Sequence, residues 1–150
     1  MVQGTDKIKI IVTNRKANFE YEILTRYEAG LVLTGTEVKS LREGKANLQE
    51  AYGRIKKDEV WLINSNISEY KFGNINNHDP QRDRKLLLNK KEIRKIKQLL
   101  QEKGLTLVPL KFYFKNSNVK VELGVARGKK LYDKRESIKK REVERKLSRI

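Results

Sequence analysis

Short segments in which apolar and polar residues alternate recur along this chain, and they limit its possible folds more than any other feature. Residues 119–125 place Val or Leu at every second position, with Lys120 and Glu122 between them. Residues 105–115 alternate too, but the apolar register shifts by one residue beside Pro109. Such a shift predicts a β-bulge, which bends a strand as a small barrel requires.

Other segments predict further strands and the connections between them. Residues 7–13 form a short strand or arm, residues 19–23 a half-buried strand, and residues 31–33 a more deeply buried one. Residues 51–56 and 60–64 form a hairpin around a tight turn at 57–59. We expect loops or turns at residues 14–18 and 26–30, and a long exposed loop over residues 70–83, a kind of loop that is often functional.

One helix is clear in the sequence. Residues 90–103 carry Ile93, Ile96, Leu99 and Leu100 on one face, and Asn89 stands in the capping position. A short helix capped by Thr36 and one more helical turn at residues 47–50 are also expected. About six strands with one well-defined inserted helix favour a mainly β fold, a small closed barrel, over a parallel sheet.

Positive charge is concentrated at the end of the chain. Residues 127–150 hold 11 Lys or Arg against 4 Asp or Glu, so this segment carries nearly half of the net charge of +16. The segment has too few apolar residues for a core and should order against a polyanion. A solvated tail that only aids solubility is the alternative. We therefore divide the chain into a barrel, residues 1–126, and a basic tail, residues 127–150.

The overall composition narrows the possible partners. A net charge of +16 points to a nucleic acid or an anionic membrane surface. The apolar runs are too short to span a bilayer, and the N-terminus lacks the apolar stretch of a signal peptide. No Cys is present, which excludes disulfides and thiolate metal sites, and a single His makes a His-based metal centre improbable.

Four motifs are more specific than these patterns. They are GLVLTGTEVKSLR at residues 30–42, HDPQRDRKLLL at 78–88, GVARGKK at 124–130 and DKR at 133–135. In this order they resemble the SsrA-binding protein family of bacteria, and the similarity runs from about residue 11 to residue 150. The resemblance implies an oligonucleotide-binding-type (OB-like) closed barrel with about three helices and a basic C-terminal tail.

The same resemblance implies a function in ribosome rescue. Family members bind the transfer-RNA-like domain of transfer-messenger RNA and deliver it to ribosomes stalled on truncated messages, where trans-translation tags the incomplete protein. The tail, disordered when free and helical on the ribosome, occupies the small-subunit decoding centre and the empty message channel. We accordingly expect a cytoplasmic monomer that needs no cofactor and is not an enzyme. Alanyl-tRNA synthetase and elongation factor Tu would join the complex indirectly, through the RNA.

Candidate RNA contacts on the barrel follow from the family positions and their basic neighbours. Asn14 can read a base edge, and the cations can meet phosphates. Glu28 can accept from a base amine or a ribose 2′-hydroxyl, although a structural pairing with Lys or Arg at a turn is its ordinary role. For Leu87, core packing is the usual alternative to packing on a base. The full set is Asn14, Arg15, Lys16, Glu28, Arg84, Lys85 and Leu87.

Tail residues match the family motifs or supply counter-charges for ribosomal RNA. At position 132 the family often has His; this chain has Tyr, whose flat ring is suited to stacking. The expected contacts are Gly128, Lys129, Lys130, Tyr132, Asp133, Lys134, Arg135, Lys139, Lys140, Arg141, Arg145, Lys146 and Arg149.

Several side chains have competing interpretations. Trp61, Phe112 and Phe114 alternate with apolar neighbours, so we expect core positions rather than base-stacking platforms; Tyr52 and Tyr113 stay undecided. His78 is expected in a loop near RNA or solvent, because no second His, Cys or carboxylate pair supports catalysis. A general basic RNA-binding or ribosomal protein remains the alternative function, and an RNA-processing enzyme lacks an identifiable catalytic group.

Overall fold

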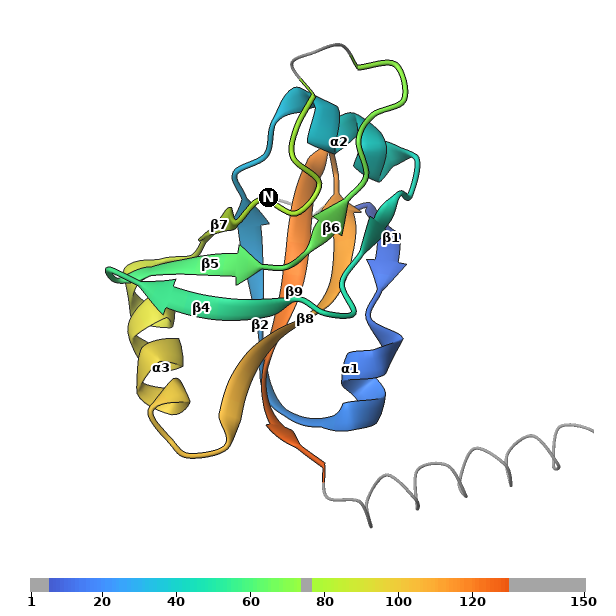
Figure 1. Ribbon diagram of the computed structural model, residues 1–150. Helices are drawn as coiled ribbons and strands as arrows, with labels where there is room; N and C mark the ends of the chain where they lie inside the picture. Colours follow the sequence, from blue (N-terminus) through green and yellow to red (C-terminus); the bar gives the residue numbers. More distant parts are fainter. Residues whose placement is uncertain (1–5, 74–76, 130–150) are drawn as a thin grey trace, which may run out of the picture.

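Two long antiparallel strands near the end of the chain organise the fold. The computed structural model describes residues 6–73 and 77–129, and Figure 1 shows the arrangement. The described elements are β1 (Ile8–Thr13), α1 (Arg15–Glu20), β2 (Tyr21–Leu31), α2 (Gly35–Arg42), β3 (Ala46–Asn47), β4 (Tyr52–Lys56), β5 (Glu59–Ile63), β6 (Asn66–Ile67), β7 (Arg84–Leu87), α3 (Lys90–Leu100), β8 (Leu105–Lys115) and β9 (Asn118–Gly128).

The main sheet closes into a barrel. Its strand order is β1-β8-β4-β5-β7-β2-β9, and β9 also pairs with β8, so β1 lies outside the closed ring. Where β4 pairs with β8, Gly53 lies opposite Leu107. A Cβ on Gly53 would lie 2.3 Å from Cδ2 of Leu107, so only glycine lets the Leu107 side chain approach the β4 backbone this closely. The mainly β, closed-barrel fold expected from the sequence is therefore confirmed.

The predicted bulge in β8 is present. The register between β8 and β9 shifts between Pro109 and Lys111. On either side of the shift, Leu107 and Phe112 are fully buried in the barrel core. The alternating residues of β9, with Val121 and Leu123 among them, form the facing part of this core.

The helices lie against the barrel, with α2 at the top of Figure 1 and α3 at the lower left. Asn89 caps α3 in a capping box with Glu92, as expected, although the helix ends at Leu100 rather than at residue 103. Ile96 is the buried residue of α3. An ion pair of 2.9 Å between Lys97 and Asp58 joins α3 to the turn of the β4–β5 hairpin.

Several local predictions were wrong because distant partners decide these segments. Residues 14–18 are not a loop: Asn14 caps α1, and Ala17 of that helix packs into a small apolar cluster. Residues 26–30 are not a turn but the second half of β2, paired with β9 over their whole length. Their polar side chains face outward. Residues 31–33 are not a separate buried strand, since β2 ends at Leu31 and Val32 is exposed.

Two further corrections concern the region after β2. The cap of α2 is Thr34 rather than Thr36, because Thr34 and Glu37 form a capping box. Residues 47–50 are not helical; Ala46–Asn47 instead pairs with β6. The β4–β5 hairpin is confirmed, and its two-residue turn has positive φ at Lys57 and Asp58, as a type I′ turn requires.

Strand β9 continues to Gly128, which pairs with Tyr21, and the Lys129 N–H donates to the Glu20 carbonyl. Arg127 and Gly128 thus lie in the barrel sheet. Among the described residues, no helix is long and apolar enough to cross a membrane. The same residues contain no cluster of three His, Cys, Asp or Glu suited to a metal ion.

Candidate nucleic-acid interface

Glu28 lies on the outer face of the barrel, where β8, β9 and β2 run side by side. The Tyr113 hydroxyl donates to its carboxylate, and Lys115 Nζ lies 3.1 Å away. The hydrogen bond from Tyr113 and the nearby lysines hold the pKa of Glu28 below its usual value. Glu28 is therefore a partly exposed, ionised acceptor within a basic surface. It pairs with a lysine as its structural interpretation expected, but on a strand rather than at a turn.

Leu87 is half exposed, at 50%, so the core position favoured by its sequence context is wrong. It lies opposite Gly30 of β2, Gly30 lies opposite Lys120 of β9, and Lys120 lies opposite Tyr113 of β8. With no side chain on Gly30, Leu87 and the Lys120 ammonium approach from both sides, each within 4 Å of where a Cβ would stand. An apolar side chain, a cation and the Glu28 carboxylate thus lie together on this face.

The predicted cations differ in whether they form an ion pair with a carboxylate. Lys85 pairs with Glu59 at 2.6 Å, and Lys16 pairs with Glu50 at 2.8 Å. The hydrogen bond to Glu50 raises the pKa of Lys16. Arg15 is exposed on α1. These three side chains reach solvent, so a phosphate can approach each of them.

Asn14 is buried, and its side chain is occupied by the protein itself. Its amide nitrogen donates to the carbonyls of Leu48 (3.0 Å) and Pro109 (2.9 Å), and its Oδ1 accepts from the Ala17 N–H. Direct reading of a base edge, as predicted, does not fit this arrangement, because the amide already bonds through both of its polar atoms. Asn14 instead fixes α1, with exposed Arg15 and Lys16, against β8.

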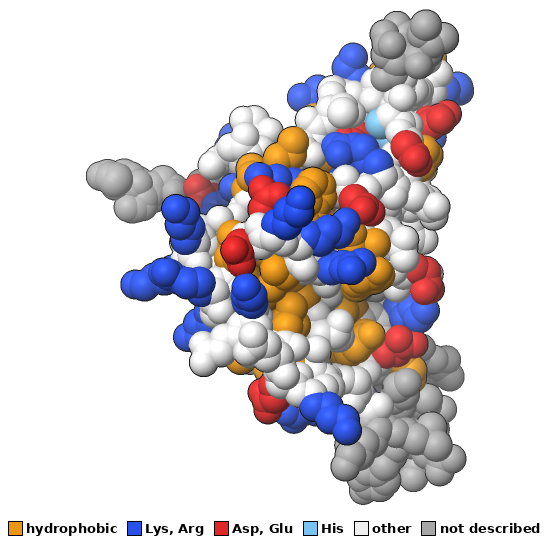
Figure 2. Space-filling model, turned by 60° about the vertical axis from the view of Figure 1, so that its left-hand side comes forward, with side chains coloured by type: hydrophobic (Ala, Val, Ile, Leu, Met, Phe, Trp, Pro, Cys, Tyr) orange, Lys and Arg blue, Asp and Glu red, His pale blue; other side chains and the backbone are white. Residues whose placement is uncertain are grey.

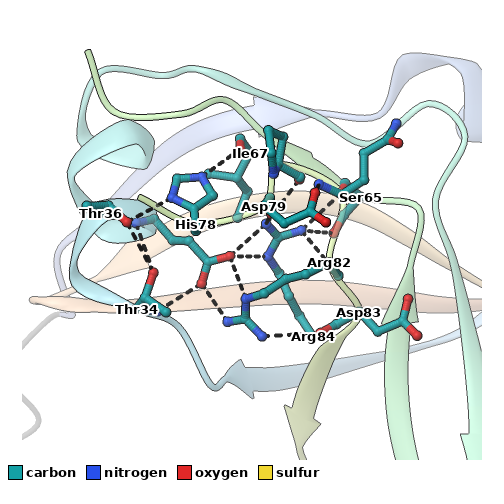
Figure 3. A network of polar contacts seen from close by, with 12 residues as sticks. Thr34, Thr36, Ser65, Ile67, His78, Asp79, Arg82, Asp83 and Arg84 are labelled. Carbon is teal, nitrogen blue, oxygen red and sulfur yellow. Dashed lines mark hydrogen bonds and ion pairs between the residues drawn. The ribbon is translucent and has the colours of Figure 1, made fainter. Parts of the chain in front are cut away.

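Arg84 is fully buried, so direct phosphate contact by this side chain does not fit the structure either. It belongs to the polar network drawn in Figure 3. Arg82 and Arg84 both donate in this network to the fully buried carboxylate of Glu37. Arg84 Nε donates to Glu37 at 2.7 Å, and Arg82 donates from Nε at 3.0 Å and from Nη2 at 2.6 Å. Nη1 of Arg84 also donates to two acceptors on Ser65, its carbonyl oxygen and its hydroxyl oxygen.

The charges in this network stabilise one another. Burial by itself would raise the pKa of Glu37, but hydrogen bonds from Arg82 and the Thr34 N–H, together with the charge of Arg84, lower it overall. Burial lowers the pKa of Arg84, and Glu37 partly offsets this effect. The result is a charged junction joining α2, the segment after β5 and the start of β7.

His78 is buried rather than loosely exposed, which corrects the prediction from sequence. Its Nε2 donates to the Ile67 carbonyl at 2.8 Å, because a carbonyl can only accept. Its Nδ1 then accepts from the Thr36 hydroxyl at 2.9 Å. With both ring nitrogens occupied, His78 holds the loop against α2 and β6 and is not placed for acid–base catalysis.

Together, these buried groups position the start of β7. Arg82 also donates to the Val32 carbonyl just after β2, and Arg84 is the first residue of β7. Lys85 and Leu87 follow within the same short strand. The motif at residues 78–88 therefore combines buried positioning residues with exposed candidate contacts, a division that its basic composition does not reveal.

The aromatic predictions are partly confirmed. Phe112 is fully buried and Phe114 packs against the core, as expected. Trp61 is half-buried but alternates with the buried Val60 and Leu62 and carries Lys56 over its ring, so its predicted core position is wrong. Tyr113 is buried and Tyr52 is exposed. Sequence reasoning missed the aromatic pair in the loop after β6, in which Phe72 is exposed and Tyr70 is half-buried. The available signal was the alternation of aromatic residues with lysine at residues 70–72.

Helix α3 adds a basic surface next to β7. Its first half exposes Lys90, Lys91, Arg94 and Lys95, and none of these makes an ion pair with the described residues. Cations at a helix N-terminus oppose the helix dipole and repel one another, so this cluster costs stability when no anion is bound. Figure 2 looks onto this side of the molecule, where Lys and Arg side chains lie around and over hydrophobic ones.

Most predicted tail contacts cannot be placed on this structure. Gly128 lies in β9 and Lys129 follows it directly. The others lie outside the described residues: Lys130, Tyr132, Asp133, Lys134, Arg135, Lys139, Lys140, Arg141, Arg145, Lys146 and Arg149.

Comparison with known proteins gives a consistent result. A family model described as SmpB protein matches residues 11–150. The SsrA-binding protein of Thermosynechococcus vestitus is 57% identical over 145 residues, covering 96% of this chain and 95% of the relative. That of Gloeothece citriformis is 58% identical over 150 residues, covering 99% and 97%. A solved structure described as "tmRNA-SmpB: a journey to the center of the bacterial ribosome" superposes with a TM-score of 0.70 at 48% identity, covering 85% of this chain and 93% of that one.

Proposed function

Because the chain belongs to the SmpB protein family, we propose that it binds the transfer-RNA-like domain of transfer-messenger RNA and delivers it to stalled ribosomes for trans-translation. The observation that carries this proposal is the family match, which spans both the barrel and the C-terminal residues to position 150. The barrel holds the RNA. Residues 130–150 occupy the decoding centre and the empty message channel.

The outer face of the barrel has the chemistry that RNA recognition needs. Leu87 packs against an unstacked base, Lys115 and Lys120 meet phosphates, and Glu28 accepts from a base amine or a ribose 2′-hydroxyl. Arg15, Lys16 and Lys85 supply further phosphate contacts. In this proposal Asn14 and Arg84 are positioning residues: they hold α1 and β7 in place and do not touch the RNA.

The protein acts by binding and positioning rather than by covalent chemistry. It works in the cytoplasm, because its partners are bacterial ribosomes and their RNA. It acts as a monomer and needs no cofactor. Alanyl-tRNA synthetase and elongation factor Tu are held in the same complex through the RNA.

A general basic RNA-binding protein without rescue activity is the second candidate. The net charge of +16 and the exposed cations of α3 favour it, since electrostatic contacts with phosphates do not depend on sequence. Selectivity separates the two functions: rescue requires a preference for the transfer-RNA-like domain over ordinary transfer RNA.

A competition gel shift tests this selectivity. Labelled transfer-RNA-like domain is bound at near-physiological salt by the full chain and by residues 1–129, which retain all of β9, and excess bulk transfer RNA is added. We expect both proteins to hold the labelled RNA, and only the full chain to support tagging in reconstituted translation. Equal competition by bulk transfer RNA would establish the general RNA-binding function instead.

The role of Glu28 is tested against Glu122, which lies directly opposite it on β9 and pairs with Arg26 at 2.9 Å. Each Glu→Ala variant removes one negative charge from the same face. If Glu28 reads the RNA, E28A weakens binding of the transfer-RNA-like domain and leaves salt-sensitive binding of unrelated RNA intact, whereas E122A retains both. Similar losses for the two variants would mean that Glu28 acts only through the charge or stability of the sheet.

A further inference from the structure

Phe72 is the most exposed large hydrophobic side chain of the described residues, at 73%. It lies in the loop between β6 and β7, which Figure 1 shows at the top beside α2, whereas Glu28 and Leu87, which the proposed function uses, lie on the barrel strands β2 and β7. A ring left in water gains little from folding, and single exposed apolar residues are common. The surroundings of this ring are what distinguish it.

Phe72 is part of a cluster of rings and cations. The Tyr70 and Phe72 centroids lie 5.7 Å apart at an interplanar angle of 71°, an edge-to-face arrangement. Lys71 Nζ lies 5.7 Å from the Phe72 centroid, and Lys39 Nζ, from α2, lies 5.5 Å from that of Tyr70. Neither lysine forms an ion pair with a carboxylate of the described residues. Two rings and two uncompensated cations thus meet at one place on the surface.

The described part of this loop has a defined conformation. Asn77 Oδ1 accepts from the Tyr70 N–H at 3.2 Å, and Asn77 Nδ2 donates to the Tyr70 carbonyl at 2.8 Å. The Gly73 N–H donates to the same carbonyl at 2.8 Å. A Cβ on Gly73 would lie 2.4 Å from Asn77 Nδ2, so a larger residue would push this clamp apart. Next in sequence, buried His78 ties the loop to α2 and β6.

We propose that Phe72, supported at its side by Tyr70, is a stacking platform for an unpaired RNA base, with Lys39 and Lys71 neutralising the adjacent phosphates. Exposed rings beside cations are what single-stranded RNA requires, because every base has a flat face and every nucleotide carries a phosphate. A hydrophobic protein pocket is less suited as the partner, since the centres of protein interfaces are poor in lysine. This inference rests on the proposed function and adds a second contact to it.

Three variants of the full chain isolate the aromatic ring. Phe72→Tyr keeps the flat ring, Phe72→Leu keeps the apolar volume without it, and Phe72→Ala removes both. Because the side chain is mostly exposed, all three should fold. Affinity for the isolated transfer-RNA-like domain and for isolated small ribosomal subunits is measured at several salt concentrations.

We expect the Ala and Leu variants, but not the Tyr variant, to bind about 5- to 150-fold more weakly, the usual range for loss of one stacked base. The slope of log affinity against log salt should stay unchanged, since no phosphate contact is lost. Replacing both Lys39 and Lys71 by Gln should instead reduce the slope by about 1.4, or about 0.7 per phosphate.

The two binding partners identify the source of the base. A ring-dependent loss on the isolated domain assigns it to transfer-messenger RNA, and one confined to the subunits assigns it to ribosomal RNA. The inference is wrong if all three variants bind both partners as tightly as the unmodified chain does. It is also wrong if the Leu variant binds as tightly as the Tyr variant, which is the result expected if Phe72 enters an apolar protein pocket. The unmodified chain serves as the reference: if it fails to prefer the domain over bulk transfer RNA, the proposed function fails independently of Phe72.

Discussion

Replacing Glu37 by glutamine removes the buried carboxylate on which Arg82 and Arg84 converge. The change alters volume little, but it leaves two guanidinium groups facing a neutral amide. The amide nitrogen of glutamine is itself a donor, so at least one arginine loses its acceptor. Arg84 has no exposure to solvent and cannot recover the interaction from water.

The expected cost follows from this burial. Removing one partner of a buried ion pair costs about 3–5 kcal/mol, because the other charge stays buried without compensation. Arg82 is 30% exposed in its side chain and is partly rehydrated, so it adds little to this figure. A domain of this kind is stable by about 5–15 kcal/mol, so E37Q removes a large fraction of the total.

Urea unfolding at neutral pH, followed by circular dichroism, measures the effect. Thermal unfolding gives a second measurement. Each kcal/mol of lost stability lowers the midpoint of thermal unfolding by about 2–4 °C in a chain of this size, so E37Q should lower it by roughly 6–20 °C. Glu59→Gln is the matched control. Glu59 pairs with Lys85 at the same 2.6 Å that separates Glu37 from Arg84, but both partners are about 40% exposed. Exposed pairs contribute about 0–1 kcal/mol.

The two ion pairs have the same length and differ in burial, so burial sets the expected difference in stability. If the free energy of unfolding of E37Q lies within about 1 kcal/mol of that of the unmodified protein, or is no lower than that of E59Q, Glu37 does not stabilise the fold as a buried charge.

Two further predictions concern pH and salt. The pKa of Glu37 is lower in the folded chain than its ordinary value of 4.5, so its contribution to stability is present above that pH and is lost as the pH falls through the folded value. E37Q should therefore show a flatter loss of stability as the pH falls below 4.5. A loss of stability with acid as steep as that of the unmodified chain would contradict this. Replacing Lys91 and Lys95 of α3 by Gln should reduce the salt slope of RNA binding by about 1.4–1.8. Replacing Lys56 and Lys97, which already pair with carboxylates, removes the same charge and should change the slope much less; equal changes would mean that net charge alone matters.

The local pattern of the sequence determined much of the architecture. Alternation predicted β8 and β9, the register slip beside Pro109 predicted the bulge, and Asn89 predicted the start of α3. Each of these features depends only on residues that lie close together in the sequence. The four motifs likewise identified the family, because their order and spacing are properties of the chain itself.

Only the tertiary structure decided which of the candidate residues face outward. Arg84 and Leu87 lie three residues apart in one basic motif, yet Arg84 is fully buried against Glu37, a residue 47 positions away, while Leu87 is exposed beside Gly30. Asn14 is likewise buried, and its side-chain amide donates to the carbonyls of Leu48 and Pro109. Burial depends on contacts between segments far apart in sequence. The composition of a motif therefore predicts that it takes part in binding, but not which of its side chains touch the RNA.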